Sequence, residues 1–335
     1  MRSIAQHRGL RPAGEPGDPA RRVTRPGRAA RKDRAFKGLT LAFALVATAL
    51  PVLIAIELSR TSSQSVHRFG WGFITSRTWD PVREVFGALP FAYGTIVSSL
   101  LALVIAVPLG LGAAIWLAEA APRLLRAPVG FLVELLAAIP SVVYGLWGIF
   151  VLVPILRDRF EAPLAERFPS LPLLSGQPFG IGMLAGGVIL AIMVIPFITS
   201  ISQQVLLAVP SSQREAALAL GATKWEMIRT AVLPYARSGV VGAIMLGLGR
   251  ALGETMAITM VIGNVPDISS SLFNPGYTMA SVLANEFSEA SSDMHRAALI
   301  EIALLLFVIT IIVNIVARLM IRATVRGAGG AEGLR

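Results

Sequence analysis

The 335-residue sequence predicts an all-α, polytopic membrane protein with six transmembrane helices. Hydrophobic residues make up 54% of the chain and charged residues only 15%, whereas soluble domains carry roughly a quarter charged residues. Six apolar stretches each reach the roughly 20 residues that a helix needs to cross the hydrocarbon core of a bilayer. They cover residues 39–58, 91–118, 129–156, 181–207, 238–263 and 298–321.

The formal charge of +10 is concentrated in an N-terminal tail, residues 1–38. This tail holds eleven Arg or Lys against three acidic residues, with prolines among them. Such a composition predicts a disordered basic tail near anionic lipid head groups. Residues 39–321 then form the membrane domain, and residues 322–335 form a second tail.

The distribution of positive charge predicts how the helices are oriented, because Arg and Lys accumulate in cytoplasmic loops. The N-terminal tail, the loops after the second and fourth helices, and the C-terminal end carry the excess of positive residues. We therefore expect these segments, and both termini, to face the cytoplasm.

The residue inventory excludes several kinds of site. The chain has no cysteine, which rules out disulfides, thiolate metal sites and cysteine nucleophiles. Its three histidines, His7, His67 and His295, are far apart in sequence, and we expect solvated loop residues rather than metal ligands. There is no G-x-x-x-x-G-K-[ST] segment, so the chain lacks the loop that cradles ATP phosphates. Energy for any active process would have to come from a partner.

The predicted cytoplasmic segment 210–234 has the pattern of two short helices. Ser212 with Glu215, and Thr223 with Glu226, have the spacing of capping boxes. In a capping box, an N-cap hydroxyl and a carboxylate three residues later satisfy free amides at the helix start.

A glycine and a proline delimit these two helices. Gly221 suits the left-handed residue that ends a helix, and Pro234 opposes continuation of the second helix. Ala216 and Ala217 keep the first helix slim, so a groove in another protein can close over it. The alternative is a hairpin that packs on the membrane surface, with both glutamates serving only as caps.

Four ionisable residues fall inside the predicted transmembrane helices, where each costs roughly 2.5–3.5 kcal/mol near the helix centre. They are Glu134, Arg250, Glu254 and Glu301. Arg250 and Glu254 are four residues apart, so we expect them to share one helical face and to pair. The guanidinium offers bidentate donors to a tetrahedral oxyanion, and Glu254 would compensate its charge when the site is empty. The alternative is a structural ion pair that fixes helix register.

Glycines flank this pair. Gly249 and Gly253 have the small-xxx-small spacing that lets a neighbouring helix approach closely. Glu134 and Glu301 lie nearer the helix ends, where snorkelling explains their presence as well as transport does.

The segment 210–234 resembles the EAA loop by which permeases of ABC importers insert into a cleft of their ATPase subunit. The resemblance rests on fixed spacings between Glu215, Ala216, Ala217, Gly221, Ala231, Leu233 and Pro234. The family usually carries a larger aliphatic residue where this chain has Ala231, which is a mild departure.

A narrower resemblance, to the PstC family of phosphate-importer permeases, rests on the stretch Gly249–Ala257. Three further stretches, 79–82, 139–145 and 275–280, also resemble that family. The resemblance covers about residues 69–321. It implies a type I (MetI-like) permease bundle in the inner membrane of a bacterium.

The PstC resemblance also implies a function and partners. The chain would be a permease subunit of an ATP-driven, high-affinity importer of inorganic phosphate, with Arg250 and Glu254 on the phosphate pathway. Its partners would be a PstA-like permease, two PstB-like ATPase subunits that bind ATP and Mg, and a PstS-like extracytoplasmic binding protein. The chain itself would bind no cofactor or metal and would catalyse no reaction.

Other functions stay open at this point. A secondary carrier could move an anion with protons through Glu254 and Arg250 without an ATPase. Sulfate and molybdate permeases share the EAA loop, so the identity of the substrate is inferred only from the PstC-like stretches. A membrane scaffold that reports phosphate status to a sensor kinase could coexist with transport.

Overall fold

The computed structural model describes residues 28–329, and their side chains from 33 to 322. The rest of the predicted N-terminal tail, and residues 330–335, lie outside the described residues. The described backbone is helical, with two isolated β-bridges and no strand. The chain divides into two compact units, residues 1–54 and 55–335, which we describe separately.

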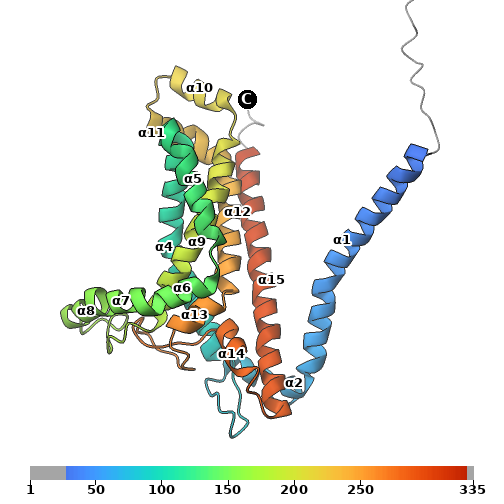
Figure 1. The fold of residues 1–335 in the computed structure, drawn as a ribbon, viewed down its shortest axis with the longest axis vertical. Coiled ribbons are helices and arrows are strands. Elements are labelled where there is room, and N and C mark those ends of the chain that lie inside the picture. The colour runs from blue at the N-terminus through green and yellow to red at the C-terminus, as the bar shows by residue number, and fades with distance from the viewer. Residues whose placement is uncertain (1–27, 330–335) are drawn as a thin grey trace, which may run out of the picture. The chain divides into compact units, whose positions relative to one another are not determined.

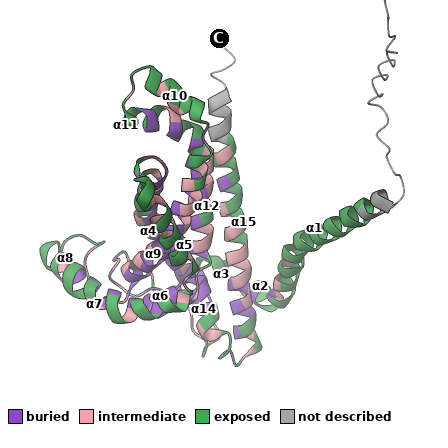
Figure 2. Ribbon diagram, turned by 45° about the horizontal axis from the view of Figure 1, so that its top comes forward, coloured by how far each residue is buried: buried purple, intermediate pink, exposed green. Residues whose placement is uncertain are grey.

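The first unit contains most of helix α1 (Arg28–Thr61), which confirms a helix over the predicted span 39–58. Every described side chain from 33 to 54 is exposed (Figure 2). Disorder was expected throughout 1–38, yet α1 begins at Arg28. Residues 28–37 contain alanine, arginine and lysine, which favour helix, and neither glycine nor proline interrupts them.

The second unit is a bundle built around two closely packed helices (Figure 1). Helix α4 (Leu89–Ile115) continues through a π-helical turn, Trp116–Ala120, and packs along α9 (Met183–Leu207). Helix α12 (Leu233–Leu252) lies against α4, α9 and α15 (Asp293–Gly329). Fully buried side chains at the centre include Ala102, Ala106, Ile189, Ala191, Ile198 and Ile258.

Six helices in the described part of the chain are long and apolar enough to cross a membrane, which agrees with the predicted number. They are Asp33–Thr61, Leu89–Ala120, Ser141–Arg167, Met183–Leu207, Lys224–Leu252 and Asp293–Arg322. The third and fifth differ from the predicted boundaries, and both differences arise from a break in a helix.

The prediction of one helix over 129–156 is wrong. Helix α5 (Arg123–Ala138) ends before Pro140, and α6 (Ser141–Trp147) leads through π-helical turns into α7 (Val153–Leu156) and α8 (Ala162–Arg167), at a large angle to α5 (Figure 1). Proline has no N–H to donate and disfavours helical geometry in the residue before it. Ile139 is accordingly extended, with φ −66° and ψ 130°.

The fifth span is also interrupted. A continuous helix runs from Lys224 to Leu252. It stops at Gly253, and a short helix, α13 (Met256–Val261), follows after three residues. The predicted uninterrupted span 238–263 is therefore wrong, and Arg250 and Glu254 lie on opposite sides of the break.

The loops that the charge pattern assigned to one side of the membrane lie at one end of the second unit, and those assigned to the other side lie at the opposite end. One end of the bundle contains the turn before α5, helices α10 (Ser211–Ala219) and α11 (Lys224–Met227), and the C-terminal part of α15 (Figure 1). Helices α6, α7, α8 and α14 (Met279–Glu286) lie at the other. That the first end faces the cytoplasm stays a prediction.

At the α14 end, a buried aromatic cluster contains His295, whose expected solvated position is wrong. Its side chain is 8% exposed and its Nε2 lies 3.2 Å from an oxygen of Glu286. The same carboxylate accepts a 2.9 Å hydrogen bond from the Trp79 indole, and the His295 ring stacks on Phe86 at 5.3 Å. These contacts tie α14, α15 and the loop before α4 together.

Close approach of α12 to α9 occurs at Gly239 and at Gly247, not at the predicted Gly249 and Gly253. A Cβ on Gly247 would lie 2.9 Å from Val194 and 3.0 Å from Ile198, whereas one on Gly249 meets nothing within 4 Å. At Gly253 the nearest atom is the carbonyl of Gly249 itself. Two residues along a helix turn the direction by about 200°, so Gly249 faces away from α9.

We expect Gly247→Ala to lower stability by about 1–3 kcal/mol, because the added methyl overpacks the α9–α12 contact. Gly249→Ala is the matched control, since it makes the same change of helix propensity in the same helix. Thermal unfolding of the two purified variants in one detergent measures the difference. Equal melting temperatures would contradict the packing described for Gly247.

Candidate functional site

The predicted coupling segment 210–234 begins with α10 (Ser211–Ala219), and the turn that ends this helix is the one expected of Gly221. Gly221 has φ +86°. Its N–H donates to the Leu218 carbonyl at 3.0 Å, and the Ala222 N–H donates to the Ala217 carbonyl at 3.2 Å. These paired bonds form a Schellman motif, which satisfies carbonyls at the helix end.

One predicted capping box is present and the other is absent. Thr223 Oγ1 accepts from the Glu226 amide at 3.3 Å, and a Glu226 carboxylate oxygen accepts from the Thr223 amide at 2.8 Å. The Ser212 and Glu215 box is wrong. Helix α10 starts two residues earlier than that box requires, with Pro210 at its N-cap and no capping side chain, so Ser212 lies within the first turn. Glu215 is exposed on α10.

The second helix of the segment was expected to be short, but it is long. Helix α11 (Lys224–Met227) continues through a π-helical turn, Ile228–Val232, directly into α12. Leu233 and Pro234 are the first two residues of α12, so Pro234, which was expected to oppose continuation of the helix, lies within it, directly after the π-helical turn. The coupling segment and the fifth span are thus one continuous helix.

Between α10 and this continuous helix lies a groove of about 500 Å³. Its lining combines positions of the EAA pattern with neighbouring residues: Gln213, Ala216, Ala217, Leu220, Ala222, Thr230, Ala231, Pro234 and Tyr235. Ala231, the departure from the usual pattern, lies in this groove, where its small side chain leaves space that a larger aliphatic residue would fill.

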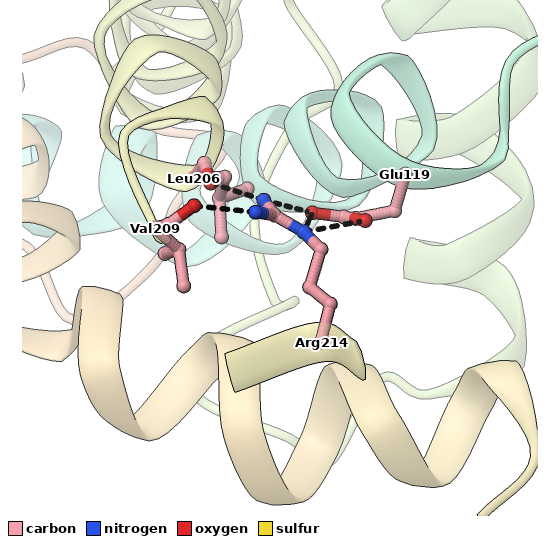
Figure 3. Close-up of polar contacts among 4 residues, drawn as sticks. All are labelled: Glu119, Leu206, Val209 and Arg214. Carbon is pink, nitrogen blue, oxygen red and sulfur yellow. Dashed lines mark hydrogen bonds and ion pairs between the residues drawn. The ribbon is translucent and has the colours of Figure 1, made fainter. Parts of the chain in front are cut away.

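Arg214 fastens α10 to the bundle, a role that the sequence did not reveal (Figure 3). Its guanidinium reaches the Glu119 carboxylate through Nε at 3.1 Å and Nη2 at 2.7 Å. Nη2 also donates to the Leu206 carbonyl at 2.8 Å, and Nη1 donates to that of Val209. The Glu119 side chain is only 9% exposed and that of Arg214 20%. One arginine thus joins α10, the end of α4 and the end of α9.

Sequence reasoning counted Arg214 only as part of the positive charge bias. The signal that could have found the pair is Glu119, an acidic residue at the end of an apolar span that the charge pattern placed beside the coupling segment. The two partners are 95 positions apart in the sequence, which hides the contact.

Arg250 does not pair with Glu254, contrary to expectation. Arg250 lies in the last turn of α12, with its guanidinium carbon 4.3 Å from the centroid of the Phe197 ring. Its Nε is buried and has no hydrogen-bond partner among the described residues. Glu254 lies beyond the break, where its Oε1 accepts from the Ala257 amide at 3.3 Å and so helps to cap α13. The break at Gly253 separates the two charges.

Two of the PstC-like stretches, 139–145 and 275–280, pack against the fifth span just beyond this break. Helix α6, from the stretch 139–145, packs on α13 so closely that a Cβ on Gly145 would lie 3.2 Å from the Cα of Ala257. From the stretch 275–280, the Gly276 amide donates to the Ile262 carbonyl at 2.9 Å. Segments far apart in sequence thus surround the end of the fifth span.

The other two ionisable residues in the predicted spans have different surroundings. Glu134 is exposed on α5. Glu301 is buried on α15, and one of its carboxylate oxygens has no hydrogen-bond partner among the described residues. We assign neither residue to the site.

Comparison with known proteins identifies the family. A family model described as the binding-protein-dependent transport system inner membrane component matches residues 106–326. The chain belongs to this family. It is therefore a component of a membrane transport system, and the predicted permease bundle is confirmed.

Three relatives indicate a narrower group, the phosphate transport system permease proteins PstC. The protein of Mesorhizobium japonicum is 48% identical over 86% of this chain and 90% of its own length. That of Haemophilus influenzae is 48% identical over 85% and 92% of the two chains. PstC 2 of Mycobacterium tuberculosis is 42% identical over 90% and 95%.

A solved structure supports the fold. A chain from the crystal structure of a bacterial ABC transporter involved in the import of the acidic polysaccharide alginate has a TM-score of 0.52 with this chain. The two share 18% identity over 85% of this chain and 98% of the other. At that identity the likeness concerns the fold alone.

We expect Arg214→Met to loosen α10, because it leaves the Glu119 carboxylate buried without its cation. Breaking a buried pair costs about 3 kcal/mol or more, which predicts that amide hydrogen exchange in α10 speeds up on the order of a hundredfold. Hydrogen-exchange mass spectrometry of the purified chain measures this change.

The control for this prediction is Arg229→Met, which removes an exposed arginine from the same segment. The double variant Arg214→Met with Glu119→Leu should recover part of the protection, because it removes the unpaired charge as well. Unchanged exchange in Arg214→Met would show that other contacts hold α10.

Proposed function

We propose that this chain is the permease subunit of an ATP-driven, high-affinity importer of inorganic phosphate and forms half of its translocation pathway. The observation that carries the proposal is identity of 42–48% with PstC proteins over at least 85% of the chain. The packing of two PstC-like stretches, 139–145 and 275–280, against the last part of the fifth span supports it.

The proposed complex contains a PstA-like permease as the other half of the pathway, two PstB-like ATPases and a PstS-like extracytoplasmic binding protein. The groove between α10 and α12 supports an ATPase partner, because it presents small apolar side chains to a protruding element. The sequence has no ATP loop of its own, so ATP and Mg would be bound by the partner. Both termini and α10 would face the cytoplasm.

Arg250 is the group that we propose meets the anion. A guanidinium binds two oxygens of a tetrahedral oxyanion through parallel N–H donors. A salt bridge to Glu254 would occupy those donors, but Glu254 caps α13 instead. The positive charge of Arg250 therefore has no paired carboxylate among the described residues.

The proposed cycle is alternating access. Closure of the two ATPases would move α10, and Arg214 would carry this motion to the ends of α4 and α9. The continuous helix from Lys224 to Leu252 would move as a lever, with Gly253 as the point where the fifth span bends. Hydrolysis of ATP would reverse the motion.

A proton-coupled secondary carrier is less well supported than the importer. That alternative needs Glu254 and Arg250 to exchange charge, and the structure separates them. It also leaves the groove beside α10 without a use. Purified chain in liposomes that moved phosphate down a proton gradient, without any ATPase, would restore this alternative.

We expect Arg250→Gln to abolish phosphate uptake while the complex still assembles, because the amide lacks the charge and the paired donors. Labelled-phosphate uptake in a knockout complemented with the variant, with sulfate and arsenate as competitors, tests both the residue and the substrate. Arg318→Gln, an exposed arginine near the end of α15, is the control. Normal uptake by Arg250→Gln would remove the anion role.

We expect Gly221→Val to weaken recovery of the ATPase subunit about tenfold in detergent pulldowns, because a branched residue at positive φ costs roughly 1–2 kcal/mol. Gly221→Asn should keep more of the binding, since asparagine tolerates left-handed geometry better. Ala219→Val introduces the same side chain at an exposed helical position and serves as control. Full retention by Gly221→Val would mean that this turn does not shape the docking surface.

A further inference from the structure

The Arg250 guanidinium contacts the Phe197 ring. Its central carbon lies over the ring, 4.3 Å from the ring centroid. A cation over an aromatic face is attracted by the ring quadrupole, more strongly where water is excluded. The ring is a partner for the charge, but it has no oxygen to accept hydrogen bonds from the guanidinium N–H groups.

The packing of α9 on α12 produces this contact. Gly247 lets the two helices approach at Val194 and Ile198. Arg250 is three residues beyond Gly247, on nearly the same face of α12. Phe197 is adjacent to the fully buried Ile198 on α9. The glycine contact thus brings the base of the arginine beside the aromatic ring.

We infer that Phe197 is a positioning residue that holds the Arg250 guanidinium by one face, so that a tetrahedral oxyanion binds edge-on to its in-plane donors. This inference rests on the proposed anion role of Arg250. A carboxylate could hold the arginine equally firmly, but it would compete with the anion for the same donors. An aromatic ring holds the cation without that competition.

The alternative is that Phe197 only fills space between α9 and α12. The two roles differ in what they require of the side chain. Packing requires apolar volume, whereas the positioning role requires a negative π face. Replacements that separate volume from π character therefore distinguish them.

The test uses the complete importer, reconstituted with its partner subunits in proteoliposomes. Phe197→Leu keeps an apolar side chain without a π face, and Phe197→Trp keeps the π face. Phe197 is also replaced by phenylalanine with one, two and three ring fluorines, which weaken the quadrupole step by step at nearly constant size. The readouts are the phosphate uptake rate at saturating substrate and the phosphate transported per ATP hydrolysed.

We expect Phe197→Leu to lower the uptake rate about tenfold and to lower the phosphate-to-ATP ratio, and Phe197→Trp to retain most of the rate. The rate should fall with each added fluorine. Phe150→Leu, at an exposed phenylalanine, is the control and should transport normally. If Phe197→Leu does not assemble, the fluorinated series alone decides.

Equal rates across the fluorinated series, or equal loss in Phe197→Leu and Phe197→Trp, would overturn the inference and leave a packing role. Measuring Arg250→Gln in the same assay distinguishes failure of the proposed anion role of Arg250 from failure of the positioning role of Phe197. Normal transport by Arg250→Gln removes the anion role itself, whereas loss in Arg250→Gln with a flat fluorinated series removes only the role of Phe197.

Discussion

A single constraint organises this structure: inside a bilayer, each freed backbone group and each charge must find its partner within protein. The break at Pro140 is accompanied by a hydrogen bond from the Tyr144 hydroxyl to the Leu136 carbonyl at 2.8 Å. The end of α9 is satisfied by Arg214, and the start of α13 by Glu254. Side chains that look like isolated charges in the sequence thus serve the ends of interrupted helices.

Helix α9 connects the two parts of the candidate site. Its C-terminal carbonyls accept from Arg214 of the coupling segment, and its middle carries Phe197 under Arg250. The helix packs along α4, whose end supplies Glu119. A displacement of α10 would therefore act on the helix whose Phe197 contacts Arg250, without any need for the two ends of the candidate site to touch.

Most of what the sequence predicted correctly is local, although the equally local Ser212–Glu215 box was wrong. Hydropathy predicted the number of spans, and the Gly221 turn and the Thr223–Glu226 cap follow from conformational preferences of a few adjacent residues. The sequence was insufficient where long-range packing decides. The Arg214–Glu119 pair joins residues 95 positions apart. The separation of Arg250 from Glu254 depends on a break that helical spacing cannot reveal, since the two residues fit an unbroken helix equally well.

That separation also weighs against a purely structural role for Arg250. If Arg250 only fixed helix register, we would expect a carboxylate paired with it, because a charge within the membrane is costly. A buried donor without a partner costs about 1–3 kcal/mol more. Instead the nearby carboxylate caps α13, the guanidinium carbon lies over the Phe197 ring, and Nε stays without a partner among the described residues. In the proposed function, an oxyanion supplies the partner that the described residues do not give to Arg250.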